Sequence, residues 1–252
     1  YDLTLFVQIA EWSSGVEQLL STGECDMFCY TVERTLSPLL REAKGTDELI
    51  ILIKKCTKCI KDFYTDLKLV RGKSIRDDGK ELYKVLSRVK ALNKEQHITI
   101  QPFFNILGRI EEQVSFFQND NLIQIIFECV KLCEKFGQYQ QAYTFLRENI
   151  VNYVCINLGL DWGKEKPDRL IAERTINTMI HKNNEDYSDN EQADFEDINH
   201  MLKNDMDFIT DDALKLFRDL VNFRNDLDHA EFREDNPSKD KIISKIDSFI
   251  ER

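Results

Sequence analysis

Near the C-terminus the chain reads Asn222-Phe223-Arg224-Asn225-Asp226-Leu227-Asp228-His229-Ala230, a run whose residue types could act on a phosphodiester. Arg224 supplies a permanent cation, Asn225 an amide, and His229 a side chain that exchanges protons near neutral pH. Such groups can bind a phosphate, orient it and move a proton without a metal ion. Arg224, Asn225 and His229 are therefore the candidate catalytic residues.

The spacing of this motif leaves two interpretations open. On a regular helix residues advance by about 100°, so Arg224 and His229 lie roughly 140° apart, whereas Asn225 and His229 share a face. A distorted turn, or a two-fold axis that joins two copies of the motif, could bring arginine and histidine to one phosphate. The alternative is an exposed helix end where Arg224 pairs with Asp228 and His229 caps a carbonyl group. Spacing alone favours the alternative.

Composition describes a globular, helical and acidic chain. Of 252 residues, 42% are hydrophobic and 31% charged, which is typical of a folded protein. Only 9 Gly and 4 Pro occur, which favours helices over a turn-rich β fold. The longest apolar run, from Leu49 to Ile53, is too short to cross a bilayer, so we expect no membrane span. Seven cysteines, an odd number, favour free thiols and a reducing, cytoplasmic location.

Hydrophobic periodicity predicts an all-α fold, a helical bundle with an additional N-terminal helical subdomain. The predicted helices cover about 4–20, 48–70, 83–89, 102–110, 121–136, 138–158, 167–180, 210–221 and 239–250. Gly72 and Gly79 bracket a predicted turn before the third of these helices. A boundary near residue 120 separates an N-terminal subdomain or connector, 1–120, from a bundle that presents the motif, 121–252. The acidic, polar stretch 182–197 is predicted to be an insertion or surface loop.

Cys56-x-x-Cys59 has the spacing of half a zinc site. A structural zinc ion needs about four ligands, and no second C-x-x-C pair is present in the sequence. Both thiols lie on the apolar stripe of the predicted helix 48–70, where cysteine acts as a small hydrophobic residue. We therefore expect buried, structural cysteines and predict neither a metal nor another cofactor.

Residues 54–94 hold 13 Lys or Arg against 5 Asp or Glu, a local charge of +8 in a chain of net charge −11. Lys54, Lys58 and Lys61 form a stripe with Lys68 on one face of the predicted helix. The stripe is either a solvated helix face or a groove for an anionic ligand, and the three lysines are the candidate substrate-binding residues. The overall acidity argues against general coating of nucleic acids, because that affinity comes from Lys and Arg.

The run Phe223-Arg224-Asn225-x-x-x-His229-Ala230, late in an all-α chain and before a terminal amphipathic helix, resembles the signature of HEPN ribonucleases. That signature is R-x4-6-H with a polar residue after the arginine. The stretch from Gly137 to Glu148, followed by Ile150-Val151-Asn152, is similar to the first HEPN helix of CRISPR-associated CARF–HEPN effectors. Residues 1–12 resemble the helix that follows the sensor in those proteins. The resemblance covers most of the chain, and only its motif at 224–229 is specific.

The resemblance implies a metal-independent, homodimeric endoribonuclease of single-stranded RNA, an antiviral effector whose site is Arg224, Asn225 and His229. The family's sensor, a Rossmann-like domain called CARF, binds cyclic oligoadenylate. Nothing in this sequence reads as the strands of that domain. Cyclic oligoadenylate would therefore act only through a sensor absent from this chain.

In such a site the ribose 2′-OH attacks the adjacent phosphorus and leaves a 2′,3′-cyclic phosphate and a 5′-OH, which requires RNA. His229, with an ordinary pKa of about 6.5, would move the proton, and Arg224 would bind the phosphate as negative charge builds. Asn225 would position the phosphate or the imidazole. Two alternatives stay open: a non-catalytic HEPN-like bundle that binds RNA or a protein, and a helical module whose residues 54–94 dock an acidic partner.

Overall fold

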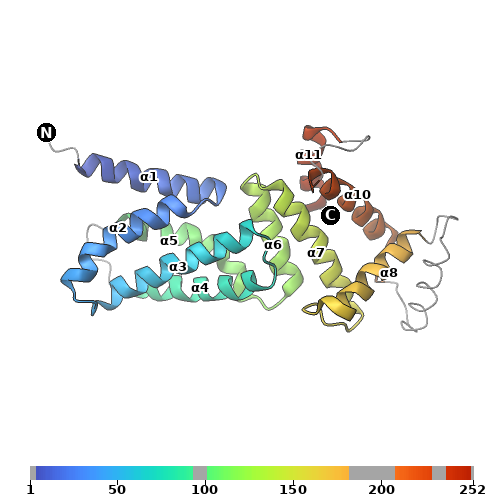
Figure 1. Ribbon diagram of the computed structural model, residues 1–252, viewed down its shortest axis with the longest axis horizontal. Helices are drawn as coiled ribbons and strands as arrows, with labels where there is room; N and C mark the ends of the chain where they lie inside the picture. Colours follow the sequence, from blue (N-terminus) through green and yellow to red (C-terminus); the bar gives the residue numbers. More distant parts are fainter. Residues whose placement is uncertain (1–3, 93–100, 182–207, 229–236, 251–252) are drawn as a thin grey trace. The chain divides into compact units, whose positions relative to one another are not determined.

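The computed structural model describes residues 4–92, 101–181, 208–228 and 237–250, and the regular elements of this part are all helices (Figure 1). The predicted all-α fold is confirmed. The chain forms two compact units, Tyr1–Gln141 and Ala142–Arg252, and the division falls inside α7 (Tyr139–Asn157). The sequence placed a boundary near residue 120. The structural division lies later because α6 (Leu122–Lys135) packs on α3 (Glu48–Lys68) of the N-terminal unit.

The N-terminal unit is a succession of helices, each packed on the one before it. It comprises α1 (Thr4–Thr22), α2 (Asp26–Glu42), α3, α4 (Ser74–Ala91), α5 (Gln101–Val114), the 3-10 turn η2 (Ser115–Gln118) and α6. α3 and α4 lie side by side (Figure 1), and α5 packs on both α4 and α1. Phenylalanine rings fill the core, with Phe63 edge-on to Phe117 at a centroid distance of 5.3 Å. Their burial supplies the apolar area that holds the helices together.

Local sequence signals set several helix ends where the sequence predicted them. Asn121 caps α6, since its side-chain oxygen accepts a hydrogen bond from the Gln124 backbone N–H at 3.2 Å. Thr210 caps α10 (Asp211–Asp228) in the same way, through the backbone N–H of Ala213 at 3.2 Å. Gly159 follows the end of α7 with φ 69°, a left-handed conformation that glycine adopts without a Cβ clash.

Helix α2 is the element that the sequence analysis did not predict. Phe28, Val32 and Leu36 recur every four residues and are almost fully buried, so this face packs into the core of the unit. Pro38 lies inside the helix, where it removes one backbone donor. The burial of the apolar face outweighs the loss of that hydrogen bond.

The C-terminal unit is built from α7, the short turn η3 (Glu165–Arg169), α8 (Leu170–His181), α10 and α11 (Lys239–Ile250). Its apolar core joins α7, α8 and α10 through Val151, Val154, Cys155, Ala172, Ile176, Ile180, Leu214 and Phe217. The predicted helix 239–250 is confirmed residue for residue. The predicted insertion at 182–197 lies outside the described residues.

All seven cysteines are free thiols and are buried, as the sequence predicts for Cys56 and Cys59. Burial raises the pKa of the Cys56 thiol, because the thiolate would be deprived of water. Among the helices of the described ranges, none combines the length and hydrophobicity that a bilayer span requires.

The turn predicted between Gly72 and Gly79 is wrong at its second glycine, because Gly79 lies within α4. A Cβ built on Gly79 would approach ring carbons of Phe117 to 2.5 Å, so the aromatic ring occupies the space a side chain would need. The absence of a side chain at Gly79 allows the Phe117 ring to pack directly against the helix backbone. Neither the spacing nor the composition of the sequence predicts this contact.

Replacing Gly79 with alanine should therefore destabilise the N-terminal unit by about 1–3 kcal/mol, because the buried ring must shift. Gly108→Ala is the matched control, since no described atom beyond its chain neighbours and the nearby backbone of its own helix α5 lies within 4 Å of its Cβ position. We expect that change to be neutral or to stabilise by about 0.5–1 kcal/mol. Urea unfolding followed by circular dichroism measures both, and equal effects would contradict the packing argument.

Candidate functional site

The candidate motif occupies the last turn of α10, which is helical through Asp228. Arg224 and Asn225 are both partly buried there. The third candidate catalytic residue, His229, lies outside the described residues. Two of the three predicted site residues are therefore placed, on adjacent positions of one helix.

An aromatic cluster fixes this turn of α10 against α7 and α11. Tyr143 of α7 stacks on Phe223 with a centroid distance of 5.8 Å and meets Phe249 of α11 edge-on at 6.1 Å. The Tyr143 hydroxyl donates a 2.8 Å hydrogen bond to the backbone carbonyl of Ile242, so the buried phenol is satisfied. Phe223 immediately precedes Arg224, so the cluster sets the position of the arginine backbone.

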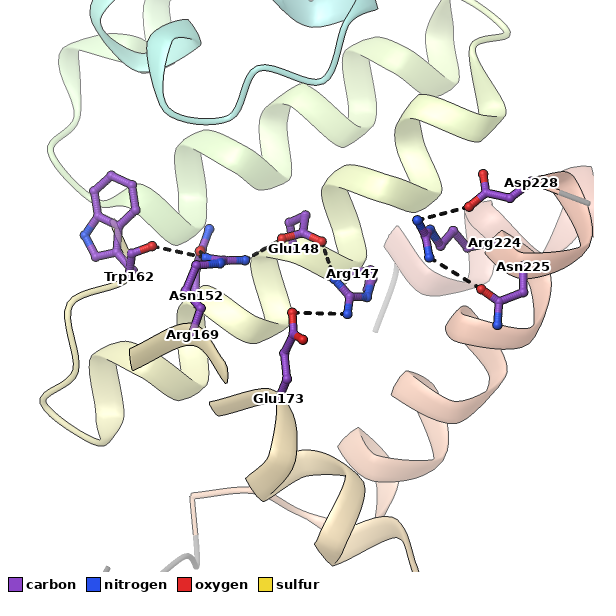
Figure 2. Close-up of polar contacts among 9 residues, drawn as sticks. All are labelled: Arg147, Glu148, Asn152, Trp162, Arg169, Glu173, Arg224, Asn225 and Asp228. Carbon is purple, nitrogen blue, oxygen red and sulfur yellow. Dashed lines mark hydrogen bonds and ion pairs between the residues drawn. The ribbon is translucent and has the colours of Figure 1, made fainter. Parts of the chain in front are cut away.

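Arg224 is held by its neighbours on the same helix. Its Nη2 lies 3.0 Å from Oδ2 of Asp228, and its Nη1 donates to Oδ1 of Asn225 at 3.4 Å. In Figure 2 the guanidinium lies between these two side chains. The Arg224 side chain remains 34% exposed and that of Asp228 27% exposed. The ion pair expected for an exposed helix end is thus present, and it offsets part of the arginine's charge.

Asp226 faces the opposite way from this pair. It is only 5% exposed, on the same side of α10 as Phe223, and its Oδ1 atom has no hydrogen-bond partner among the described residues. A buried carboxylate oxygen without a partner is costly in free energy. Asp228 is therefore the one aspartate that the structure places in contact with Arg224 among the described residues.

A second polar cluster ties α7 to η3 and α8. The carboxylate of Glu148 forms an ion pair with Arg147 through Oε1 and another with Arg169 through Oε2, so it bridges two arginines (Figure 2). Arg147 also reaches Oε1 of Glu173 in α8 at 3.2 Å, and Arg169 donates to the backbone oxygen of Trp162 at 3.2 Å. These arginine side chains are 18–21% exposed, so solvent weakens the attraction within the ion pairs less than it would at the surface.

The sequence analysis assigned no role to this bridged cluster. Burial by itself lowers the pKa of Arg147, and the adjacent carboxylates of Glu148 and Glu173 outweigh it and raise the pKa overall. An available signal was the placement of Glu148 and Asn152 four residues apart, on the partly buried side of α7. Arg169 donates to both of them, and this contact follows only from the packing of η3 against α7.

The predicted basic stripe on α3 is exposed along its length, but only part of its charge is unpaired. Lys61 lies 3.7 Å from Asp26 and Lys68 lies 2.6 Å from Glu24. Lys54 and Lys58 are exposed and have no ion-pair partner among the described residues. The stripe belongs to the N-terminal unit, and two of its cations lack a partner in the described part of the chain.

No set of three or more His, Cys, Asp or Glu side chains within the described ranges is arranged to hold a metal ion. The guanidinium of Arg224 can bind an anion, and the side-chain amide of Asn225 lies beside it.

Glu148→Gln should lower the unfolding free energy of the C-terminal unit by about 1–2 kcal/mol, because two arginines lose their shared carboxylate. The loss should shrink at high salt, where the charges are screened. Glu165→Gln, an exposed change in η3, is the control and should stay within about 0.5 kcal/mol of wild type. Equal losses in urea unfolding would show that the bridge contributes nothing.

No protein-family model matches this chain, and no curated protein is significantly similar to it.

Proposed function

We propose that this protein is a metal-independent endoribonuclease that cleaves single-stranded RNA by attack of the ribose 2′-OH, as a CRISPR-associated antiviral effector of the HEPN type. Arg224 binds the scissile phosphate, Asn225 orients it, and His229 moves the proton. The proposal rests on the sequence motif and on one observation, the guanidinium of Arg224 held at the end of α10 beside Asn225.

The contacts of Arg224 leave it able to bind a phosphate. Asp228 and Asn225 each take one N–H of the fork, and the second N–H of each Nη atom has no acceptor among the described residues, so it can donate to an incoming anion. The side chain is one-third exposed, so a phosphate can reach it without unfolding the helix. Because the two neighbours fix the fork, little side-chain freedom is lost when RNA binds.

The five-residue spacing of the motif favours a site made by two chains. On a regular helix, positions five residues apart, as Arg224 and His229 are in the sequence, point in directions roughly 140° apart. A homodimer with a two-fold axis at this helix would bring Arg224 of one chain toward His229 of the partner subunit. In the N-terminal unit, considered by itself, the exposed Lys54 and Lys58 are candidate contacts for an RNA backbone.

A second candidate function is a non-catalytic HEPN-like module that binds RNA or a protein. The ion pair between Arg224 and Asp228 favours it, since that contact stabilises a helix end without any substrate. The buried Asp226 favours it too, because a nearby negative charge repels RNA. The following experiments separate the two functions.

Wild-type protein should cleave single-stranded RNA in EDTA and leave 2′,3′-cyclic phosphate ends, and a deoxyribose substrate should stay intact. Arg224→Ala and His229→Ala should each lower the rate at least about 100-fold, because each removes a group acting on the reacting phosphate. Lys215→Ala, an exposed cation on the same helix, is the control and should cleave normally.

Undiminished cleavage by His229→Ala would remove the histidine from the mechanism. RNA binding that survives Arg224→Ala, with no cleavage by wild type, would favour the non-catalytic module. Sedimentation of wild type as a monomer at concentrations where it cleaves would contradict the two-chain site.

Asp228→Asn should raise RNA affinity and cleavage roughly two- to fivefold, because an ion pair of this exposure is worth at most about 1 kcal/mol. The change frees the Nη2 atom of Arg224 and removes a charge that repels phosphate. Asp212→Asn removes the same charge from the first turn of α10 and controls for the net effect. Slower cleavage by Asp228→Asn would mean that Asp228 is needed to orient the guanidinium.

A further inference from the structure

The N-terminal unit contains a half-open cavity that no part of the proposed ribonuclease site uses. Its volume is about 430 Å³, and α5, η2, α6 and Leu20 of α1 surround it. Cavities of roughly 300–1,000 Å³ that combine apolar walls with a few polar groups are typical of small-molecule sites. The size therefore fits a ligand larger than a simple inorganic ion.

One wall of the cavity is a positioned aromatic ring. Phe116 lines the cavity and is only partly buried. It packs against Phe117, whose side chain is fully buried, with a centroid distance of 4.4 Å and an interplanar angle of 32°. Leu20 and Leu132 complete the apolar part of the lining. A ring held in this way can stack on a flat ligand with little loss of side-chain freedom.

Three residues of the lining carry hydrogen-bond donors for which the described part of the chain supplies no partner. The Arg109 guanidinium and the Lys135 ammonium are both exposed and make no ion pair or hydrogen bond with the described residues. Gln113 accepts the Tyr64 hydroxyl on Oε1 at 2.6 Å, which leaves its amide N–H groups as donors. The buried Tyr64 thus orients a lining amide whose N–H groups bond to none of the described residues.

The charges in the lining balance in favour of an anion. Lys131 pairs with Glu128 at 2.8 Å, so these two largely cancel. Glu112 contributes one negative charge against Arg109 and Lys135, which have no ion-pair partner among the described residues. The lining is therefore net positive in a chain of net charge −11, and this local charge favours an anionic ligand.

We infer that this cavity binds a nucleoside phosphate, as a free mononucleotide or as one nucleotide of a single strand. The base stacks on Phe116, the phosphate binds Arg109 and Lys135, and the Gln113 amide donates to an acceptor of the ligand. The combination of a positioned aromatic ring with nearby cations selects this chemistry over inorganic phosphate alone or an uncharged ring. The inference does not depend on ribonuclease activity.

Isothermal titration with adenosine 5′-monophosphate, adenosine and inorganic phosphate tests the free-ligand form. We expect the nucleotide to bind at least about tenfold more tightly than either part, since stacking and charge add. Arg109→Ala with Lys135→Ala should abolish the difference between nucleotide and adenosine. Phe116→Leu should weaken nucleotide binding about tenfold and leave phosphate binding unchanged. Arg41→Ala, an exposed arginine of α2, is the matched control and should bind as wild type does.

A short oligodeoxyadenylate, which has no 2′-OH to react, tests the strand form with the same variants. Binding of the oligonucleotide alone, lost in the double variant, would support a strand rather than a free nucleotide. Circular dichroism establishes that each variant is folded. If wild type binds neither probe more tightly than phosphate, or if folded Arg109→Ala with Lys135→Ala binds both normally, the inference is overturned.

Discussion

The contacts of Tyr143 hold together the part of the molecule that carries the candidate site. Its ring stacks on Phe223 of α10 and meets Phe249 of α11, and its hydroxyl donates to the Ile242 carbonyl. A buried phenol without that acceptor would cost the free energy of desolvating its hydroxyl, so the bond favours one arrangement of the three helices. Because Arg224 follows Phe223 directly, the position of the candidate cation depends on this aromatic cluster.

The arginines of the C-terminal unit fall into two environments. Arg147 and Arg169 share the Glu148 carboxylate and reach further acceptors, so their forks are occupied by the protein itself. Among the described residues, Arg224 contacts a single carboxylate and one amide, and more of its side chain is exposed. An anion can bind Arg224 directly, whereas it would have to break the ion pairs with Glu148 to bind Arg147 or Arg169.

Unpaired cations distinguish candidate binding surfaces in this acidic protein. Among the lysines of the α3 stripe, Lys61 and Lys68 are paired, whereas Lys54 and Lys58 have no ion-pair partner within the described ranges. Around the cavity of the N-terminal unit, Lys131 is paired with Glu128, while Arg109 and Lys135 have no partner in the described part of the chain. A count of charges along the sequence treats these residues alike. Their partners come from other turns and other helices, so only packing distinguishes them.

The sequence by itself determined the helical class, most helix positions and several ends, because periodicity and capping act over a few residues. Asn121 and Thr210 cap the helices they were expected to begin, and the predicted burial of Cys56 and Cys59 is confirmed. In the candidate site, the four-residue spacing of Arg224 and Asp228 indicated their ion pair, which the structure contains. The role of His229 stays a prediction. Tertiary structure alone decided why Gly79 sits in a helix, where the units divide, and which cations are paired. Those properties depend on side chains distant in sequence that meet only when the helices pack, such as Phe117 against Gly79 or Glu148 against Arg169.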